Sequence, residues 1–450
     1  MADRESGATV QLAPVTGRAR IDVLDMLRGI AILGIFYMNI PFMGGTVQAA
    51  FGDPRLQGWM PADRWAWSII EVVAEGTQRG TLEMLFGAGM MILTAKAMTP
   101  TGPVAVADLY MRRTLWLLVF GLLDVFALLW PGDILHTYAL ASLFLFPFRK
   151  LAPRTLLILG LLWGTLGFVG GAAEYPQRVA LVHKVEAAHV AQAAHTPLSK
   201  DQKEALAEWG KKLDKLRLTP KQKKEMAEEA KARRGGFLGY AKWLHLQWID
   251  YAKSGELFWV LEAFSTMLIG VALFKWGFIQ GLSSSRTYLV AMIAAYAFGF
   301  GARAMGVHER LAFWPIPKTI WATEEYARLA VTLGHIALVN LLARTRAGYA
   351  LLSPFKAAGR IAFSLYVAET LIGMWLLFPG FGLGLWDKFG WAGLAVTATV
   401  TIVVLLIAAN IYSRYFVIGP LEWAWRSLAY CKRQRFRRHD ESPPAIVVGP

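Results

Sequence analysis

An aspartate and a histidine three residues apart form the strongest acid–base candidate in the sequence. Asp133 and His136 follow Pro131 and Gly132, in a break between two apolar runs. A neutral imidazole accepts a proton from a hydroxyl near pH 7, and a carboxylate on its other nitrogen fixes the tautomer and stabilises the imidazolium. The same spacing also suits a hydrogen-bonded histidine at a membrane interface with no chemical role. Both interpretations stay open at this point.

Polar residues also lie within the first apolar run. Asp25 and Arg28 are three residues apart, so on a helix they share one face and can neutralise each other. Asn39 follows eleven residues after Arg28, about three turns or roughly 16 Å further along that face. An ionisable group in the hydrocarbon costs roughly 2.5 to 3.5 kcal/mol, so such groups usually face the protein interior. This stripe serves either helix packing or function.

Other polar side chains in later apolar runs suit a transporter. His335 and Asn340 fall in the eighth run and Glu369 falls in the ninth. A histidine–glutamate contact between neighbouring helices would make a proton relay, and Asn39 would complete a set of sites near the midplane. The sequence shows no internal repeat of the kind many transporters have.

Charged residues also lie at the second, seventh and eighth apolar runs, with Arg303 near the outer end of the seventh and Arg328 early in the eighth. Arg303 and Arg328 can hold an anion or pair with nearby glutamates, and pairing is the expected role. Four charged residues at intervals of four also precede and enter the second run, and most of this stripe is expected outside the bilayer: Glu71, Glu75, Arg79 and Glu83.

Composition and hydrophobic patterning predict an all-α integral membrane protein. Of the 450 residues, 55% are hydrophobic and 18% are charged, which is too apolar for a soluble chain. A helix that spans about 30 Å of hydrocarbon needs roughly 20 residues. Ten apolar runs approach this length, and we expect a helix in the lipid bilayer for each: 24–44, 77–97, 114–131, 134–149, 155–172, 257–276, 286–304, 326–344, 360–378 and 394–413.

Basic residues concentrate on one side of these ten runs. Among the short loops, those on the side of the N-terminus hold most of the lysines and arginines, and those on the other side hold few. The positive-inside rule then places both termini in the cytoplasm. The net charge of +15 therefore indicates orientation rather than nucleic-acid binding.

One long polar segment divides the apolar runs. We expect a cytoplasmic tail, five spans, a polar helical loop on the outer side, five more spans and a basic cytoplasmic tail, over residues 1–20, 21–172, 173–253, 254–430 and 431–450. Within the loop, Ser199 with Gln202 is typical of a helix capping box. Thr219 with Gln222 is a second such box. The two or three helices expected here are either a solvated tether or a cap over a substrate site.

Several chemistries are disfavoured by the motifs that the sequence lacks. The single cysteine, Cys431, excludes a CxxC metal or redox site. No Walker loop, GxSxG or HExxH motif is present, so we expect neither ATP-driven transport nor a bound metal, and no bound cofactor.

Five segments resemble the YeiB-like bacterial membrane proteins. The first runs from Arg20 to Asn39 (RIDVLDMLRGIAILGIFYMN) and is followed in order by LFGAG at 85–89 and GDILHTYAL at 132–140. Gly359-Arg360 with Tyr366, and GPLEWAWR at 419–426, complete the set. The resemblance covers the whole predicted membrane region and implies a protein of the bacterial inner membrane and cell envelope.

The YeiB-like proteins are in turn similar to transmembrane acyltransferases that include the lysosomal heparan-glucosamine N-acetyltransferase. That resemblance implies a donor-binding or catalytic first helix carrying Asp25, Arg28, Gly29 and Asn39. It also implies that His136 is a base or a transient acyl carrier.

We therefore expect acyl transfer from cytoplasmic acyl-CoA to a small-molecule, lipid or glycan acceptor at the outer face. His136, Asp133 and Asn39 form the catalytic set. Guanidinium groups are suited to phosphates, and four arginines on the cytoplasmic side are the candidate donor ligands: Arg28, Arg113, Arg360 and Arg426. A secondary transporter or exporter remains the alternative, and the oligomeric state stays open.

Overall fold

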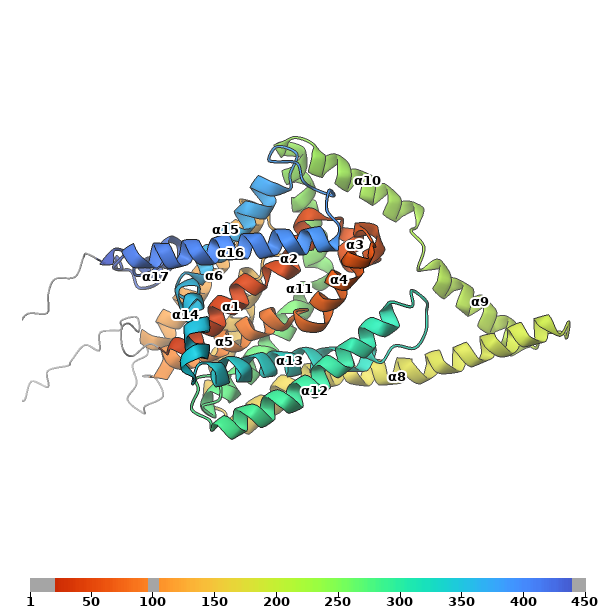
Figure 1. Ribbon diagram of the computed structural model, residues 1–450, viewed down its shortest axis with the longest axis horizontal. Coiled ribbons are helices and arrows are strands. Elements are labelled where there is room, and N and C mark those ends of the chain that lie inside the picture. Colours follow the sequence, from red (N-terminus) through yellow and green to blue (C-terminus); the bar gives the residue numbers. More distant parts are fainter. Residues whose placement is uncertain (1–20, 96–104, 439–450) are drawn as a thin grey trace, which may run out of the picture.

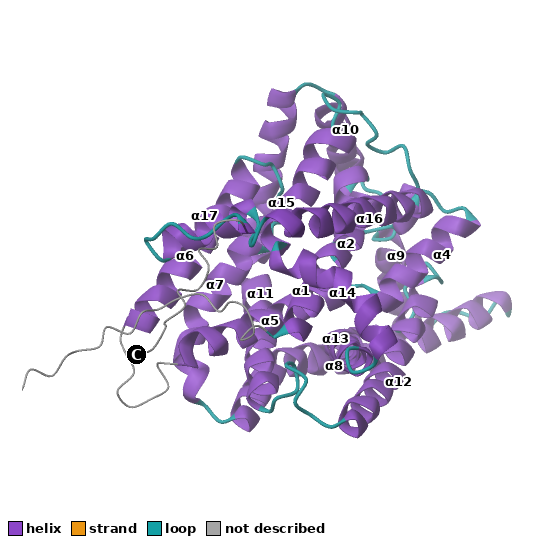
Figure 2. Ribbon diagram, turned by 60° about the vertical axis from the view of Figure 1, so that its left-hand side comes forward, coloured by secondary structure: helices purple, strands orange, loops and turns teal. Residues whose placement is uncertain are grey.

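The described part of the chain, residues 21–95 and 105–438 of a computed structural model, is a bundle of helices with no β-strand (Figures 1 and 2). This confirms the predicted all-α fold. The expected tail at 1–20, Lys96 and residues 439–450 lie outside the described residues. The helices are α1 (Asp22–Gly34), α2 (Phe36–Gly44), α3 (Val47–Phe51), α4 (Pro61–Val73), α5 (Thr77–Thr94), α6 (Ala105–Phe126), α7 (Leu135–Leu145), α8 (Pro153–Ala193), α9 (Lys200–Asp214), α10 (Pro220–Arg234), α11 (Phe237–Lys275), α12 (Ser285–Arg310), α13 (Ile320–Leu342), α14 (Arg346–Arg360), α15 (Ala362–Leu371), α16 (Trp391–Tyr415) and α17 (Pro420–Ala429), with short turns η2 (Pro54–Gln57), η4 (Phe146–Lys150) and π-helical η5 (Ile372–Leu377).

Every one of the ten apolar runs overlaps a helix, but not every such helix is long and apolar enough to cross a membrane alone. Within the described residues, five helices meet that standard, or six if the bent pair α13 and α14 counts as one span. Helix α7 has 11 residues, and α5 carries Arg79 and Glu83. A protein with several membrane-spanning helices is therefore supported, while the number ten and the orientation stay predictions.

The sequence predicted one break between helices. Pro131 lies in the turn between α6 and α7, where proline cannot donate a helical hydrogen bond. Leu129 in this turn has a φ of 65°, which makes the sharp reversal. A single turn residue that the sequence did not predict, Ile35, separates α1 from α2. Together α1 and α2 still form one candidate membrane span, Asp22–Gly44, so Arg28 and Asn39 share it.

Two glycines let α1 and α14 cross at very short range. A Cβ built on Gly29 would stand 2.0 Å from the carbonyl oxygen of Phe355, and one on Gly359 would stand 1.8 Å from the carbonyl oxygen of Asp25. Small residues allow such close backbone approach between membrane helices. This crossing brings Arg28 of α1 beside Arg360 at the end of α14.

The polar segment is continuous with the bundle rather than a separate loop over 173–253. Helix α8 runs for 41 residues and α11 for 39, so both pass through the expected boundaries without a break. Alanine, glutamate, glutamine and lysine are good helix formers, and the change from apolar to polar residues therefore does not end a helix. Figure 1 shows α8 extending beyond the bundle to meet α9.

The helices of the polar segment begin where the sequence predicted. Ser199 caps α9 and Thr219 caps α10, each with the reciprocal glutamine of a capping box. Helix α10 then packs on the bundle, because Arg233 donates hydrogen bonds to the carbonyl oxygens of Met43 and Phe42 at 3.3 and 2.9 Å. The segment is therefore anchored at this end, called here the loop end. The opposite end, where α14 and α17 lie, is called the basic end (Figure 1).

Candidate functional site

Asp133, His136 and Glu256 form a hydrogen-bonded trio at the start of α7. The Oδ2 atom of Asp133 accepts from the backbone N–H of His136 and contacts its Nδ1, both at 2.8 Å. The predicted contact between these two side chains is therefore present. Nε2 of His136 lies 3.3 Å from Oε2 of Glu256 on α11, and the Thr137 hydroxyl donates to Oε1 at 3.0 Å.

The trio can share a proton. With Asp133 ionised and accepting from Nδ1–H, Nε2 either accepts from a protonated Glu256 or donates to an ionised one. The imidazole is almost fully enclosed, with 2% of its side chain exposed, whereas 17% of the Glu256 side chain is exposed. Glu256 is therefore the accessible member of the trio. Sequence analysis missed it, because no local spacing links it to a histidine 120 residues away.

Two neighbouring helices fix the turn that carries the trio. The hydroxyl of Tyr366 on α15 accepts hydrogen bonds from the Trp130 indole and the Ile134 backbone N–H, both at 3.1 Å. On α6, a Cβ built on Gly121 would stand 2.4 Å from the backbone nitrogen of His136. Only glycine at this position leaves room for the turn.

Two further carboxyl groups are buried near this turn. Asp124 on α6 accepts from the Thr370 hydroxyl at 3.4 Å through one oxygen, and its other oxygen has no hydrogen-bond partner. Glu369, next to Thr370 on α15, has no hydrogen-bond partner on either oxygen among the described residues. Buried carboxyl groups without partners are costly, which makes them candidates for proton binding.

The four arginines predicted as donor ligands line one pocket at the basic end. Arg28, Arg113, Arg360 and Arg426 come from α1, α6, α14 and α17, and the cavity they share, called here the basic pocket, measures about 220 Å³. Its inner wall is apolar and includes Leu82, Phe86, Leu117, Ile134, Leu135 and Tyr138.

Carboxylates hold part of this basic surface in place. Asp25 lies 3.0 Å from Arg28 and 3.9 Å from Arg360. Glu422 also lines the pocket, but its carboxylate is used at the start of α15, where it accepts from the Phe363 N–H at 2.7 Å. Asp25 does not line the pocket, so the lining has four guanidinium groups and one carboxylate.

The inner end of the basic pocket lies beside the trio. Arg113 and Gly121 are eight residues apart on α6, about 12 Å along the helix. Gly121 touches the backbone of His136, and Ile134 and Leu135 line the pocket directly before it in the chain. His136 itself does not line the pocket.

The other residues predicted for the site have different positions. Asp25 holds two of the arginines, and Gly29 makes the helix crossing. Asn39 is buried on α2, and within the described residues no hydrogen bond joins its side chain to His136 or Asp133. Among the described residues, no hydrogen bond therefore connects Asn39 to the other two residues expected to be catalytic.

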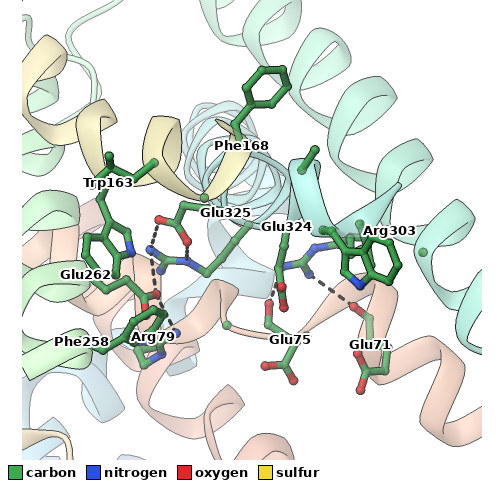
Figure 3. A pocket seen from close by; sticks show the side chains of 18 of the residues that line it. Glu71, Glu75, Arg79, Trp163, Phe168, Phe258, Glu262, Arg303, Glu324 and Glu325 are labelled. Carbon is green, nitrogen blue, oxygen red and sulfur yellow. Dashed lines mark hydrogen bonds and ion pairs between the residues drawn. The ribbon is translucent and has the colours of Figure 1, made fainter. Parts of the chain in front are cut away.

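A second cavity of about 520 Å³ lies between α5, α8, α11, α12 and α13 (Figure 3). We call it the glutamate pocket, because five glutamates line it: Glu71, Glu75, Glu262, Glu324 and Glu325. Four arginines line it as well: Arg79, Arg303, Arg310 and Arg328.

The arginines of the glutamate pocket already have hydrogen-bond or ion-pair partners. Arg328 lies 2.7 Å from Glu325, 3.0 Å from Glu262 and 3.1 Å from Glu83, so its predicted pairing is confirmed. Arg79 lies 2.8 Å from Glu262, and Arg310 lies 2.6 Å from Glu71.

One expectation about these charges was wrong. Arg303 does not pair with a nearby glutamate side chain but donates to backbone carbonyls at the end of α4, including Val72 at 3.2 Å. Helix ends leave carbonyls unpaired, which explains why an arginine is drawn to α4. Glu83 is fully buried between Arg79 and Arg328.

Two carboxylates of this pocket keep their acceptor capacity. Within the described residues, the side chains of Glu75 and Glu324 have no hydrogen bond and no ion pair. Glu75 lies in the link between α4 and α5, outside the predicted spans. Burial, with the nearby charge of Glu71, raises the pKa of Glu75 to about 7, although Arg303, Arg79 and Arg310 oppose this shift.

The residues expected for transport are dispersed. His335 contacts the Tyr296 hydroxyl through Nδ1 at 2.8 Å and the Val73 carbonyl through Nε2 at 3.2 Å. Asn340 donates to the Ile336 carbonyl at 2.9 Å. Because both ring nitrogens of His335 have other partners, no His335–Glu369 relay exists among the described residues.

The helices and their buried charged network define a polytopic helical membrane protein. Residues 273–432 match the model of a family described as "Protein of unknown function (DUF418)". The chain is 27% identical to the uncharacterized protein YxaH of Bacillus subtilis over 94% of its own length and 97% of that protein. It is 26% identical to the uncharacterized protein YeiB of Escherichia coli over 90% and 95% of the two chains.

A shorter match is to an uncharacterized 39.9 kDa protein of Bacillus acidopullulyticus, 32% identical over 33% of this chain and 39% of that one. No solved structure matches the chain. The chain is therefore similar to the uncharacterized proteins YxaH and YeiB over most of its length, and its residues 273–432 match the DUF418 family model.

Proposed function

We propose that this protein is an acyltransferase that takes an acyl group from cytoplasmic acyl-CoA and delivers it to an acceptor at the outer face of the bacterial inner membrane. One observation carries the proposal. Four arginines far apart in the sequence line a single pocket, and the inner end of that pocket lies beside a buried histidine held by two carboxylates.

The charge of the basic pocket fits the polar part of the donor. Coenzyme A carries several phosphate groups, and guanidinium binds phosphate through paired hydrogen bonds. With guanidinium groups in excess over carboxylates, an anionic ligand gains charge pairing here that water-exposed surfaces do not offer. The half-buried arginines keep contact with solvent, so the phosphates need not be fully dehydrated.

The apolar inner wall fits the rest of the donor. An extended pantetheine arm would lie between α5, α6 and α7 and carry the thioester toward Ile134 and Leu135. The distance of about 12 Å along α6 between Arg113 and Gly121 is the span such an arm has to cover. The acyl group must then pass the side chains of Ile134 and Leu135 to reach the trio.

The trio would serve the chemistry as a proton acceptor and donor. The hydroxyl or amine of the acceptor loses its proton to Nε2 of His136 through the carboxylate of Glu256, and Asp133 stabilises the imidazolium. The acceptor oxygen or nitrogen forms a bond to the thioester carbonyl carbon, and the carbon–sulfur bond breaks. The proton then returns from the imidazolium to the departing thiolate, so coenzyme A leaves as the free thiol.

Mass spectrometry of cells tests this function. Lipids, envelope glycans and secreted metabolites are compared between a deletion strain and strains that produce the wild type, His136→Gln or the control His189→Gln. His189 lies on the exposed part of α8. The expected result is one product heavier by an acyl group in the wild type and in the His189 control only. Identical profiles in all four strains would contradict acyl transfer.

A secondary transporter is the second candidate, favoured by one observation. Glu369 is buried, and neither of its carboxyl oxygens has a hydrogen-bond partner among the described residues. Such a group suits proton coupling. Proton-driven flux of a solute into vesicles, abolished by Glu369→Gln and without any acylated product, would favour transport over acyl transfer.

A further inference from the structure

The glutamate pocket has no part in the proposed acyl transfer. Most of its residues belong to helices that do not line the basic pocket. It is also the larger of the two cavities, about 520 against 220 Å³. A cavity of this size can hold a small ligand, and its two carboxylates without partners can reach such a ligand, because Glu75 is half-buried and Glu324 is exposed.

The sign of the ligand follows from which charges are already used. The guanidinium groups of Arg79, Arg310 and Arg328 lie within 3 Å of carboxylates. Arg303 is held by the carbonyls of α4. An anion would have to displace a carboxylate that cannot leave the protein, so anion binding is disfavoured.

A cation finds acceptors that are already in place. The carboxylates of Glu75 and Glu324 have no hydrogen-bond or ion-pair partner among the described residues. In Figure 3, Glu324 lies near Arg303, and Glu325 lies between Glu324 and Trp163. Trp163 and Phe258 line the same cavity, so an organic cation there can reach carboxylates and aromatic rings from one pocket.

The aromatic wall indicates an organic rather than a metal cation. Trp163 and Phe258 pack edge to face, with ring centroids 4.9 Å apart, and Phe258 continues to Trp259 at 5.2 Å. Trp259 already has a cation over its ring, because the Arg79 guanidinium lies 4.7 Å from its centroid. Aromatic faces attract alkylammonium groups, whereas a hard metal ion prefers a shell of oxygen ligands.

The rim of the pocket indicates that the ligand also has an apolar part. Leu166, Phe168 and Phe258 line the cavity and are strongly exposed, on the side of α8 and α11. Such side chains in a membrane helix suit contact with hydrocarbon. We propose that the glutamate pocket binds the ammonium group of an organic amine, carried either by a soluble amine or by an amine-headgroup lipid. This inference does not depend on acyl transfer.

Two binding measurements on the purified full-length protein test the inference. In detergent, ethanolamine is titrated while tryptophan fluorescence is followed, since Trp163, Trp259 and Trp321 line the pocket. In nanodiscs of phosphatidylglycerol with or without phosphatidylethanolamine, native mass spectrometry records which lipid stays bound. Saturable binding in the first measurement identifies a soluble amine, and selective retention in the second identifies a lipid headgroup.

Charge-removing variants separate the pocket from unspecific effects. Glu324→Gln and Glu75→Gln keep the side-chain size, and each is expected to weaken binding about tenfold or more, because a hydrogen bond to a charged group is lost. Glu204→Gln on exposed α9 is the control and keeps wild-type affinity. Saturable binding of acetate in place of ethanolamine, no binding of either amine, or equal affinities in wild type and both pocket variants would each overturn the inference.

Discussion

The two pockets are each lined by four arginines but have opposite surpluses of charge. In the basic pocket, Asp25 serves two arginines and Glu422 is used at the start of a helix, so guanidinium groups are in excess. In the glutamate pocket, every arginine has a partner and two carboxylates have none among the described residues. The comparison indicates that both the number of carboxylates around four arginines and the pairing between these charges determine which ligand a site can accept.

The two pockets also differ in how deeply their charges are buried. Arg28 has 34% of its side chain exposed, whereas Arg328 has 5%. Exposed pairs contribute little to stability, and removing one member of a buried pair leaves a costly uncompensated charge. The basic pocket can therefore exchange partners with a ligand, while the Arg328 network mainly holds helices together.

The largest expected effect concerns the chemistry next to the basic pocket. His136→Gln should lower the rate of acyl transfer by about 10² to 10⁴-fold, the usual contribution of a general base. Affinity for coenzyme A should stay unchanged, since His136 does not line the pocket. Release of free thiol from acyl-CoA by protein in liposomes gives the rate, and calorimetry gives the affinity. A variant that loses both equally would show that His136 supports the pocket instead.

The next effect concerns the stability of the glutamate pocket. Arg328→Met should destabilise the protein by about 3 to 5 kcal/mol, because it leaves the buried Glu83 and Glu262 with one partner fewer. Arg28→Gln at the more exposed basic pocket should cost roughly 1 kcal/mol or less. Denaturant unfolding in detergent micelles measures both. Similar losses in the two variants would remove the structural distinction between the pockets.

A smaller effect is expected for donor binding. Arg113→Gln should weaken coenzyme A binding about tenfold, because one charged hydrogen bond to phosphate is lost. The control is Arg112→Gln on the same helix, since Arg112 is paired with Asp108 at 2.8 Å and does not line the pocket. Equal weakening in both variants would indicate attraction by the overall positive charge rather than by the pocket.

Local sequence patterns predicted a good part of this architecture. The Pro131 break, the capping boxes of α9 and α10, and the contact between Asp133 and His136 all follow from residues within four positions of each other. The four donor arginines were grouped only by their expected side of the membrane, and their position in one pocket agrees with that grouping.

Local sequence patterns could not predict the contacts between distant segments. Glu256 and Glu262 stand near the start of an apolar run, where nothing local shows that one reaches His136 and the other reaches Arg79 and Arg328. Most of the amphipathic helix α14 falls between the predicted apolar runs 326–344 and 360–378, although it forms the crossing with α1. Buried charges also lower the apparent hydropathy of α5, which conceals how deeply Glu83 lies in the bundle.

The smallest expected effect is a pH dependence confined to the glutamate pocket. The pKa of Glu75 is raised to about 7, so this side chain is largely neutral below that pH and ionised above it. The ammonium group of an aliphatic amine has a pKa of roughly 10, so it stays charged throughout this range. Only the ionised carboxylate attracts the cation, so ethanolamine affinity should rise as pH increases from 6 to 8.

Fluorescence titrations at several pH values measure this dependence. Glu75→Gln should bind more weakly and show a flatter profile, whereas Glu204→Gln should keep the wild-type slope. Coenzyme A binding at the basic pocket should not follow the same profile, because Glu75 does not line that pocket and guanidinium groups stay charged in this range. A wild-type affinity that stays constant, or that falls, as pH rises would mean that Glu75 does not face the cation. Glu324 alone would then not account for the selectivity of this pocket.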